Sequence, residues 1–196
     1  GFTLVEMAIV LLIVALLLGG LLPTVTSQIE IQHRGDTRKQ LSEIQQALIG
    51  YTLVNGRLPC PADPTTPTGQ LNAANVPAGQ EFKNPPIGPN YVCANVQGVL
   101  PWVTLGIPET DAWGRRYTYR VTQIFADDIA LSTFGVGCAA ISIVSSFALC
   151  SNGDINVLTA AGGGTNVASN VPAIIVSHGT NGNGAYTSQG IQIPIG

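Results

Sequence analysis

The feature that most constrains this chain is an apolar stretch at its beginning that contains a single acidic residue. Between Phe2 and Leu22 every residue is apolar or small except Thr3 and Glu6. About 20 apolar residues in a helix are enough to cross a bilayer, and a carboxylate at the centre of such a helix costs roughly 2.5–3.5 kcal/mol. Near the end of the helix the cost is lower, because the side chain reaches the interface. Glu6 therefore predicts either a plain membrane anchor with its acid among the headgroups, or a partner such as the N-terminal amine of another copy.

The first six residues, Gly1-Phe2-Thr3-Leu4-Val5-Glu6, resemble the processing site and mature N-terminus of the type IV pilin superfamily. The resemblance implies that a prepilin peptidase cuts after Gly1 and that the new N-terminal Phe2 is methylated. It also implies that Glu6 pairs with the amine of a neighbouring subunit during filament assembly. The expected partners are further copies of the chain in a helical homopolymer, the prepilin peptidase, the inner-membrane assembly machinery and, before assembly, the membrane.

The hydropathy pattern and the resemblance together predict three parts. A transmembrane or filament-core helix covers residues 1–27, an amphipathic helix covers 28–56, and a globular head covers 57–196. An apolar face with helical spacing supports the second part: Leu41, Ile44, Leu48 and Tyr51. The helix is expected to end near Asn55-Gly56, since glycine is a common residue just past a helix terminus.

A break is expected inside the apolar stretch, where Gly19, Gly20 and Pro23 occur. Proline removes a backbone donor and clashes with the preceding turn, and glycine lowers helix propensity. Several filaments of the resembled family have an unwound segment at this place. We therefore expect partial melting between about Leu16 and Pro23, with a straight kink as the alternative.

The head is expected to be a loop-rich antiparallel β domain rather than a helical bundle. Only 10% of the residues are charged, and the chain contains 23 glycines and 13 prolines. Alternating side chains over residues 116–121 predict a strand with one buried and one exposed face: Tyr117, Tyr119 and Val121 against Arg116, Thr118 and Arg120. Trp102 and Trp113 are expected in the core. The predicted class is α+β, with a long N-terminal helix packed on a C-terminal antiparallel sheet, as in the pilin fold.

The chain has four cysteines: Cys60, Cys93, Cys138 and Cys150. An even number in an exported domain favours two disulfides, and three pairings are possible. We favour Cys60–Cys93 and Cys138–Cys150, because each closes a local loop. The cysteines form no close pair, and neither histidine lies near them in the sequence, so a zinc site is not expected.

No cofactor is expected. The segment Asn152–Asn156 has the alternating oxygens of a calcium loop but lacks the distal glutamate of an EF-hand. The segment 177–184 is similar to one that lies close to the calcium loop of major pseudopilins, with Asn181 in place of the acid, and this loss of charge disfavours calcium. The net charge of −3 gives no electrostatic footprint of a nucleic-acid-binding protein.

The sequence does not indicate an enzyme, because it contains neither a Gly-x-Ser-x-Gly elbow nor a His-Glu-x-x-His motif. The predicted function is a structural pilin subunit, held in the bacterial inner membrane before assembly and in an extracellular surface pilus afterwards. One alternative is a pseudopilin of a type II secretion system in a periplasmic filament. It is favoured by residues 111–119, which resemble a segment of major pseudopilins, and disfavoured by the four cysteines and the proline-rich insertion. The other alternative is a monomeric, membrane-anchored binding domain, in which Glu6 has no role in assembly.

Overall fold

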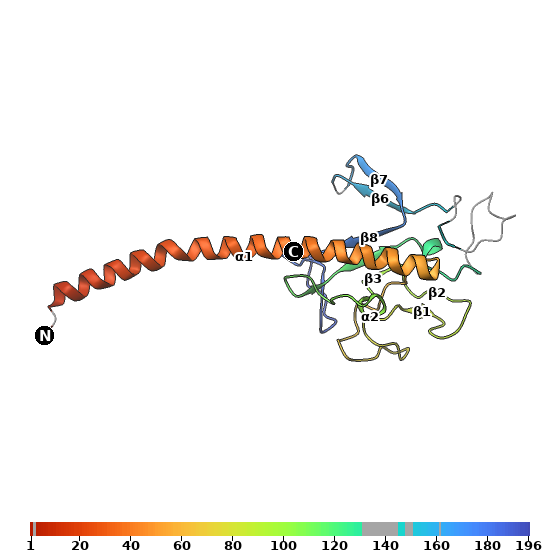
Figure 1. Ribbon diagram of the computed structural model, residues 1–196, viewed down its shortest axis with the longest axis horizontal. Helices are drawn as coiled ribbons and strands as arrows, with labels where there is room; N and C mark the ends of the chain where they lie inside the picture. Colours follow the sequence, from red (N-terminus) through yellow and green to blue (C-terminus); the bar gives the residue numbers. More distant parts are fainter. Residues whose placement is uncertain (2, 131–144, 148–150, 161) are drawn as a thin grey trace.

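A computed structural model describes residues 1, 3–130, 145–147, 151–160 and 162–196, with the side chains of residues 17–25 left out. The molecule consists of one long helix and a head that packs against the second half of that helix (Figure 1). The helix, α1, runs from Leu4 to Asn55 and contains 52 residues, which gives a length of about 78 Å at 1.5 Å per residue. The coarse class is therefore α+β, as the sequence predicted.

The predicted end of the helix is confirmed. Gly56 follows Asn55 with φ 68°, in the left-handed region, and its N–H donates to the carbonyl of Thr52 at 2.8 Å. A residue without a Cβ adopts this conformation at no steric cost, so glycine is well suited to terminate a helix here.

The structure corrects the expected melting between Leu16 and Pro23. The backbone is helical at every residue from Leu4 to Asn55, including Gly19, Gly20 and Pro23. Proline removes one donor from the ladder, whereas a melted segment would lose several bonds and require a second costly nucleation. In the single chain the continuous helix is therefore the structure that forms.

The centre of the head is a three-stranded antiparallel sheet in the order β3-β5-β8. Its strands are β3 (Gln97–Val99), β5 (Thr118–Val121) and β8 (Ala173–Val176). Buried side chains of α1 and the sheet form the main core, with Ile44 from the helix packed in the same cluster as Tyr119. The Oη of Tyr119 donates to the carbonyl of Pro59 at 3.1 Å, which satisfies the one polar atom of this buried ring.

The remaining elements are short. Two helical turns, α2 (Trp102–Leu105) and η1 (Gln123–Phe125), lie in the sequence before and after the central strand β5. Three further sheets are two-stranded: β1 (Lys83–Asn84) with β2 (Val92–Cys93), β4 (Arg115–Arg116) with β9 (Tyr186–Thr187), and β6 (Ile155–Leu158) with β7 (Asn166–Val171). The β6–β7 hairpin projects from the body of the head (Figure 1).

The alternation predicted for residues 116–121 is confirmed for the aromatic face but wrong for Arg116. Tyr117, Tyr119 and Val121 are buried as expected, whereas Arg116 is 0% exposed although the alternation predicts a solvent-facing side chain. Its guanidinium donates to Glu109 and to the carbonyls of Pro64, Thr66 and Ser188. The physical reason is that the proline-rich loop covers Arg116, whereas Thr118 and Arg120 on the same side of the chain stay partly exposed.

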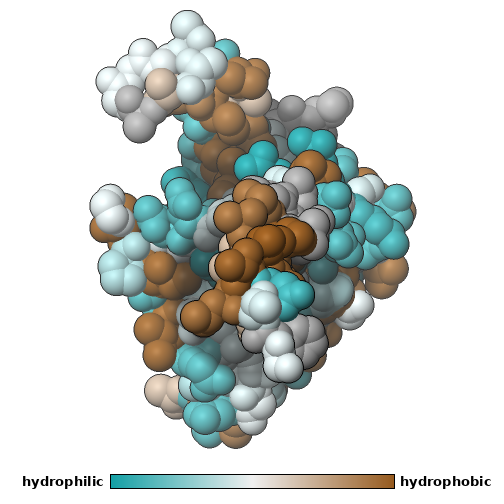
Figure 2. All heavy atoms as spheres, turned by 90° about the vertical axis from the view of Figure 1, so that its left-hand side faces the viewer, coloured by the Kyte–Doolittle hydropathy of each residue, from teal (hydrophilic) through white to brown (hydrophobic). Residues whose placement is uncertain are grey.

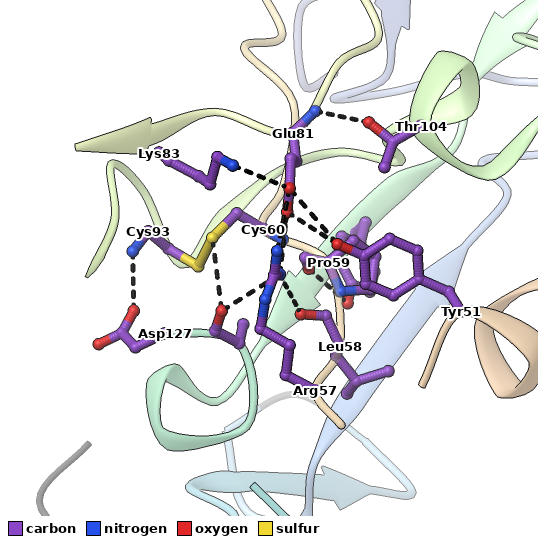
Figure 3. The surroundings of a disulfide bond; sticks show 12 residues. Tyr51, Arg57, Leu58, Pro59, Cys60, Glu81, Lys83, Cys93, Thr104 and Asp127 are labelled. Atoms are coloured by element: carbon purple, nitrogen blue, oxygen red, sulfur yellow. Dashed lines mark hydrogen bonds and ion pairs between the residues drawn. A yellow bond between two sulfur atoms is a disulfide. The ribbon is translucent and has the colours of Figure 1, made fainter. Parts of the chain in front are cut away.

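A disulfide joins Cys60 to Cys93, as the sequence predicted, with their Cα atoms 5.2 Å apart. Figure 3 shows a buried ion pair beside it. Both guanidinium ends of Arg57 reach the Glu81 carboxylate, at 2.9 and 3.0 Å, and their side chains are only 8% and 12% exposed. The other favoured bridge, Cys138–Cys150, lies outside the described residues.

Removing the Cys60–Cys93 bridge is expected to destabilise the head by about 3 kcal/mol, since it closes a loop with a sequence separation of 33. The double variant Cys60→Ala/Cys93→Ala, unfolded by urea and followed by tryptophan fluorescence, measures this loss. A variant as stable as the parent chain would show that the loop is held by its other contacts.

Candidate functional site

The first part of α1, which we call the arm (Leu4–Leu16), is an uncovered apolar surface. Its large apolar side chains are between 45% and 91% exposed. Figure 1 shows the arm projecting away from the head, and Figure 2, which views this end of the molecule, shows apolar side chains gathered on it. Exposed apolar surface of this extent marks a contact with another protein or with a membrane. Among the helices of the described residues, none carries an apolar stretch long enough to cross a membrane.

The packing of α1 explains why the arm is bare. In the second half of the helix, Thr37, Ile44 and Leu48 recur on one side and are buried against the head. The head begins at the C-terminal end of the helix and folds back along this side, so its reach ends well short of the arm. One continuous helix therefore has two different environments: its second half packs against the head, and the arm is exposed.

Glu6 lies at the tip of the arm and closes the helix N-terminus. Its Oε2 accepts the N–H of Thr3 at 2.8 Å and the hydroxyl of Thr3 at 2.9 Å. The hydroxyl oxygen of Thr3 in turn accepts the N–H of Glu6 at 3.3 Å, which completes a capping box. Within the described residues Oε1 has no partner, so this oxygen is available to a donor from outside the helix.

The role of Thr3 is one that sequence reasoning missed. Thr3-Leu4-Val5-Glu6 has the Ser/Thr-x-x-Glu spacing of a capping box directly before an apolar run, and this signal is present in the sequence. Glu6 is also the only charged side chain between Gly1 and Ile29. The carboxylate therefore combines a local role, which uses Oε2, with a second oxygen that the cap does not use.

The remaining predicted site residues are not brought together with Glu6. Gly1 is exposed at the end of the arm, and Phe2 lies outside the described residues. Gly19, Gly20 and Pro23 lie within α1, between the arm and the head. Cys60 and Cys93 are buried in the head, in the core cluster that includes Ile44 and Leu48 of α1.

The loop that resembles a pseudopilin segment already holds a cation of the protein itself. Arg115 Nη1 donates to the carbonyls of Gly179 and Thr180. The imidazole of His178 lies 2.7 Å from the hydroxyl of Thr118 and 2.8 Å from the carbonyl of Asn183, so both ring nitrogens are used. The described part of the chain contains no cluster of three or more His, Cys, Asp or Glu side chains suited to a metal ion.

Comparison of the chain with protein-family models, with curated proteins and with solved structures found no match.

Proposed function

We propose that this chain is a pilin, the structural subunit of a type IV pilus-like filament that polymerises through its N-terminal helix. The observation that carries the proposal is the bare apolar arm, which has one acid at its tip. Burying apolar surface contributes about 25 cal/mol per Å², so the arm requires either lipid or other apolar helices around it. Before assembly the inner membrane supplies the first of these surroundings, and arms of neighbouring subunits supply the second afterwards.

The single charge sets how the arms align. Cleavage after Gly1 by a prepilin peptidase frees the amine of Phe2, and this amine in a neighbouring subunit donates to Glu6. The capping box is compatible with this contact, because the two bonds from Thr3 both use Oε2 and leave Oε1 for the neighbour. An ion pair between two arms replaces the unfavourable burial of an isolated carboxylate, and it fixes the axial offset of the two subunits.

Replacing Glu6 by glutamine is expected to abolish filaments while leaving the head folded, because the neighbour's amine is then buried without a counter-charge. Glu6→Asp retains the charge and is expected to retain part of the polymer. The measurement is electron microscopy of sheared surface filaments, with mass spectrometry of the N-terminal peptide to test for a methylated Phe2. Wild-type filament yield from Glu6→Gln would sink the proposal, as would a wild-type chain that never polymerises.

A second variant separates the cap from the charge. Thr3→Ala removes the side-chain cap, which destabilises the first helical turn by about 1 kcal/mol, but it keeps the Glu6 carboxylate. Filament yield is expected to stay near that of the parent chain, with a reduced amount of helix in the subunit by circular dichroism. Loss of filaments equal to that of Glu6→Gln would instead assign the effect of Glu6 to helix capping.

The location of the filament distinguishes the pilin from a pseudopilin of type II secretion. The contact of Arg115 with the carbonyls of Gly179 and Thr180 favours the pilin, since a guanidinium uses oxygens of the loop that resembles the pseudopilin segment. Filaments recovered by shearing from the cell surface support a pilus, and filaments confined to the periplasm support a pseudopilus. If the chain is instead a monomeric binding domain, neither kind of filament is expected.

A further inference from the structure

Two exposed charges on the second half of α1 have no partner within the described residues: Asp36 and Arg38. The charges around them are paired, Arg34 with Glu30 at 2.9 Å and Lys39 with Glu43 at 3.9 Å. Arg38 also lies one helical turn from Arg34, which has the same sign, so its own helix offers it no compensation. Among the side chains that the structure describes, the exposed face of α1 therefore has one acid and one base without a partner.

These two charges cannot meet within one copy of the chain. Successive residues are about 100° apart around an α-helix, so Asp36 and Arg38 point about 200° apart, to opposite sides of α1. The head covers a third direction, on which Thr37 is buried. A pairing between the two charges consequently requires two copies lying side by side, with one copy contributing each charge.

Asp36 opens onto a groove between α1 and the head segment that includes Pro108 and Ala112. The groove has a volume of about 610 Å³, and its charged lining consists of Asp36, Glu43 and Lys39. Two carboxylates against one ammonium leave this groove net negative. Arg38, on the far side of the helix, presents a charge of the complementary sign.

We infer that Arg38 of one copy enters this groove on a second copy and pairs there with Asp36. The inference rests on the proposed function and specifies a second contact between the same two subunits. A bond from the amine of Phe2 to Glu6 of the neighbour offsets the two helices by four residues, which is about 6 Å at 1.5 Å per residue.

This offset is compatible with the contact between Arg38 and Asp36 for only one assignment of the two charges to the two copies. In the copy that supplies Phe2, Asp36 then lies level with residue 40 of the copy that supplies Glu6. Arg38 of that second copy is two residues from this level, or about 3 Å, which an arginine side chain spans. The reverse pairing, between Arg38 of the copy that supplies Phe2 and Asp36 of the copy that supplies Glu6, would require a span of about 9 Å along the axis. A single axial offset therefore satisfies both ion pairs. One subunit supplies Glu6 and Arg38, and its neighbour supplies the amine of Phe2 and Asp36.

Each subunit uses the groove on one side and Arg38 on the other, so the contact is heterologous and propagates along an open filament. Charge reversal tests it directly. Asp36→Arg and Arg38→Glu each place like charges in every contact, and each alone is expected to reduce filament yield about tenfold, because a weak repulsion repeats at every subunit. Gln70→Arg and Gln70→Glu, at an exposed position in the head, are the matched controls and are expected to leave the yield unchanged.

Mixing the two reversed chains provides the decisive arm of the experiment. In an equimolar mixture the arginine introduced by Asp36→Arg faces the glutamate introduced by Arg38→Glu on the other chain. The unchanged Asp36 and Arg38 also face each other, so alternating chains are expected to restore filaments. Either single reversal with wild-type yield, or a mixture that stays unassembled, overturns the contact. Filaments that require Glu6 but tolerate both reversals overturn this contact alone, whereas a wild-type chain that forms no filaments overturns the proposed function.

Discussion

Replacing Arg116 by methionine is expected to lower the free energy of unfolding of the head by about 4 kcal/mol, since it leaves buried acceptors without donors. The guanidinium is 0% exposed and lies 2.8 Å from the Glu109 carboxylate. Its other nitrogens lie 3.0 Å from the carbonyls of Pro64, Thr66 and Ser188. One side chain thus fixes the proline-rich loop and the C-terminal segment to the sheet.

The planar shape of the guanidinium is as important as its charge. Its carbon lies 4.6 Å from the centre of the Trp102 ring, in a cation–π contact, while its nitrogens reach five separate acceptors, the hydroxyl oxygen of Thr68 included. A lysine has one compact charged group and cannot reach all of them. Arg116→Lys is therefore expected to recover only part of the stability that Arg116→Met loses.

Arg120→Met, in the next strand β5, is the control for the loss of an arginine charge. Arg120 pairs with Asp154 at 3.3 Å, but their side chains are 40% and 56% exposed, so the expected loss is below about 1 kcal/mol. Urea unfolding followed by tryptophan fluorescence compares the three variants with the parent chain in detergent. Equal effects of Arg116→Met and Arg120→Met would show that the buried contacts of Arg116 contribute little to stability.

The parts of this fold that sequence predicted are those set by neighbouring residues. The spacing of Ile44 and Leu48 marks the face of α1 that packs on the head, and Gly56 supplies the conformation that ends the helix. The alternation of Tyr119 and Val121 marks a strand, and it holds because one face of the sheet meets α1. The Cys60–Cys93 pairing followed from the proximity of two cysteines across a loop that needs closing.

The parts that escaped prediction depend on which distant segments cover a residue. Arg116 has the polarity of an exposed strand residue, and only the folded proline-rich loop supplies the carbonyls that satisfy it. The groove beside Asp36 likewise forms between segments about 70 positions apart in the sequence. The prediction of unwinding near Pro23 was wrong for the opposite reason. The local penalty from proline and glycine is smaller than the cost of interrupting a continuous helix.

The site was predicted in part for the same reasons. Glu6 was identifiable because an acid in an apolar run is exceptional, and its cap with Thr3 was identifiable from their spacing. That the cap leaves Oε1 of Glu6 unused could not be predicted from the sequence, since it depends on which carboxylate oxygen accepts the bonds from Thr3.

Replacing Glu81 by glutamine is the second change expected to destabilise the head strongly, by about 3–4 kcal/mol at neutral pH. The substitution leaves the buried Arg57 guanidinium without a counter-charge, 5.0 Å from the Tyr91 ring and 5.4 Å from the Tyr51 ring. It also removes a 3.3 Å ion pair with Lys83. Burial raises the pKa of Tyr51, so its hydroxyl stays protonated and donates to Glu81 in the parent chain.

The pH dependence of stability distinguishes this charge effect from a packing defect. Burial alone would raise the pKa of Glu81, but the hydrogen bonds and charge of Arg57 outweigh burial and hold that pKa below its ordinary value of 4.5. A group with a depressed pKa in the folded state stabilises the protein above its unfolded pKa, and this stabilisation is lost as the pH falls through the folded pKa. The stability gap between the parent chain and Glu81→Gln is therefore expected to shrink once the pH drops below about 4.5.

Asp127 changes the pH dependence of stability in the opposite direction to Glu81, so the two contributions must be separated. Burial raises the pKa of Asp127, so its contribution is present at low pH and is lost as the pH rises through the folded pKa. Because Asp127 is unchanged in Glu81→Gln, the difference between the two chains cancels its contribution and isolates Glu81. Glu43→Gln, at an exposed carboxylate 3.9 Å from Lys39, is the matched control and is expected to cost less than about 0.5 kcal/mol. A gap for Glu81→Gln that stays constant from neutral to acidic pH would assign its effect to packing, and the buried Arg57–Glu81 pair would then not be what stabilises the junction between helix and head.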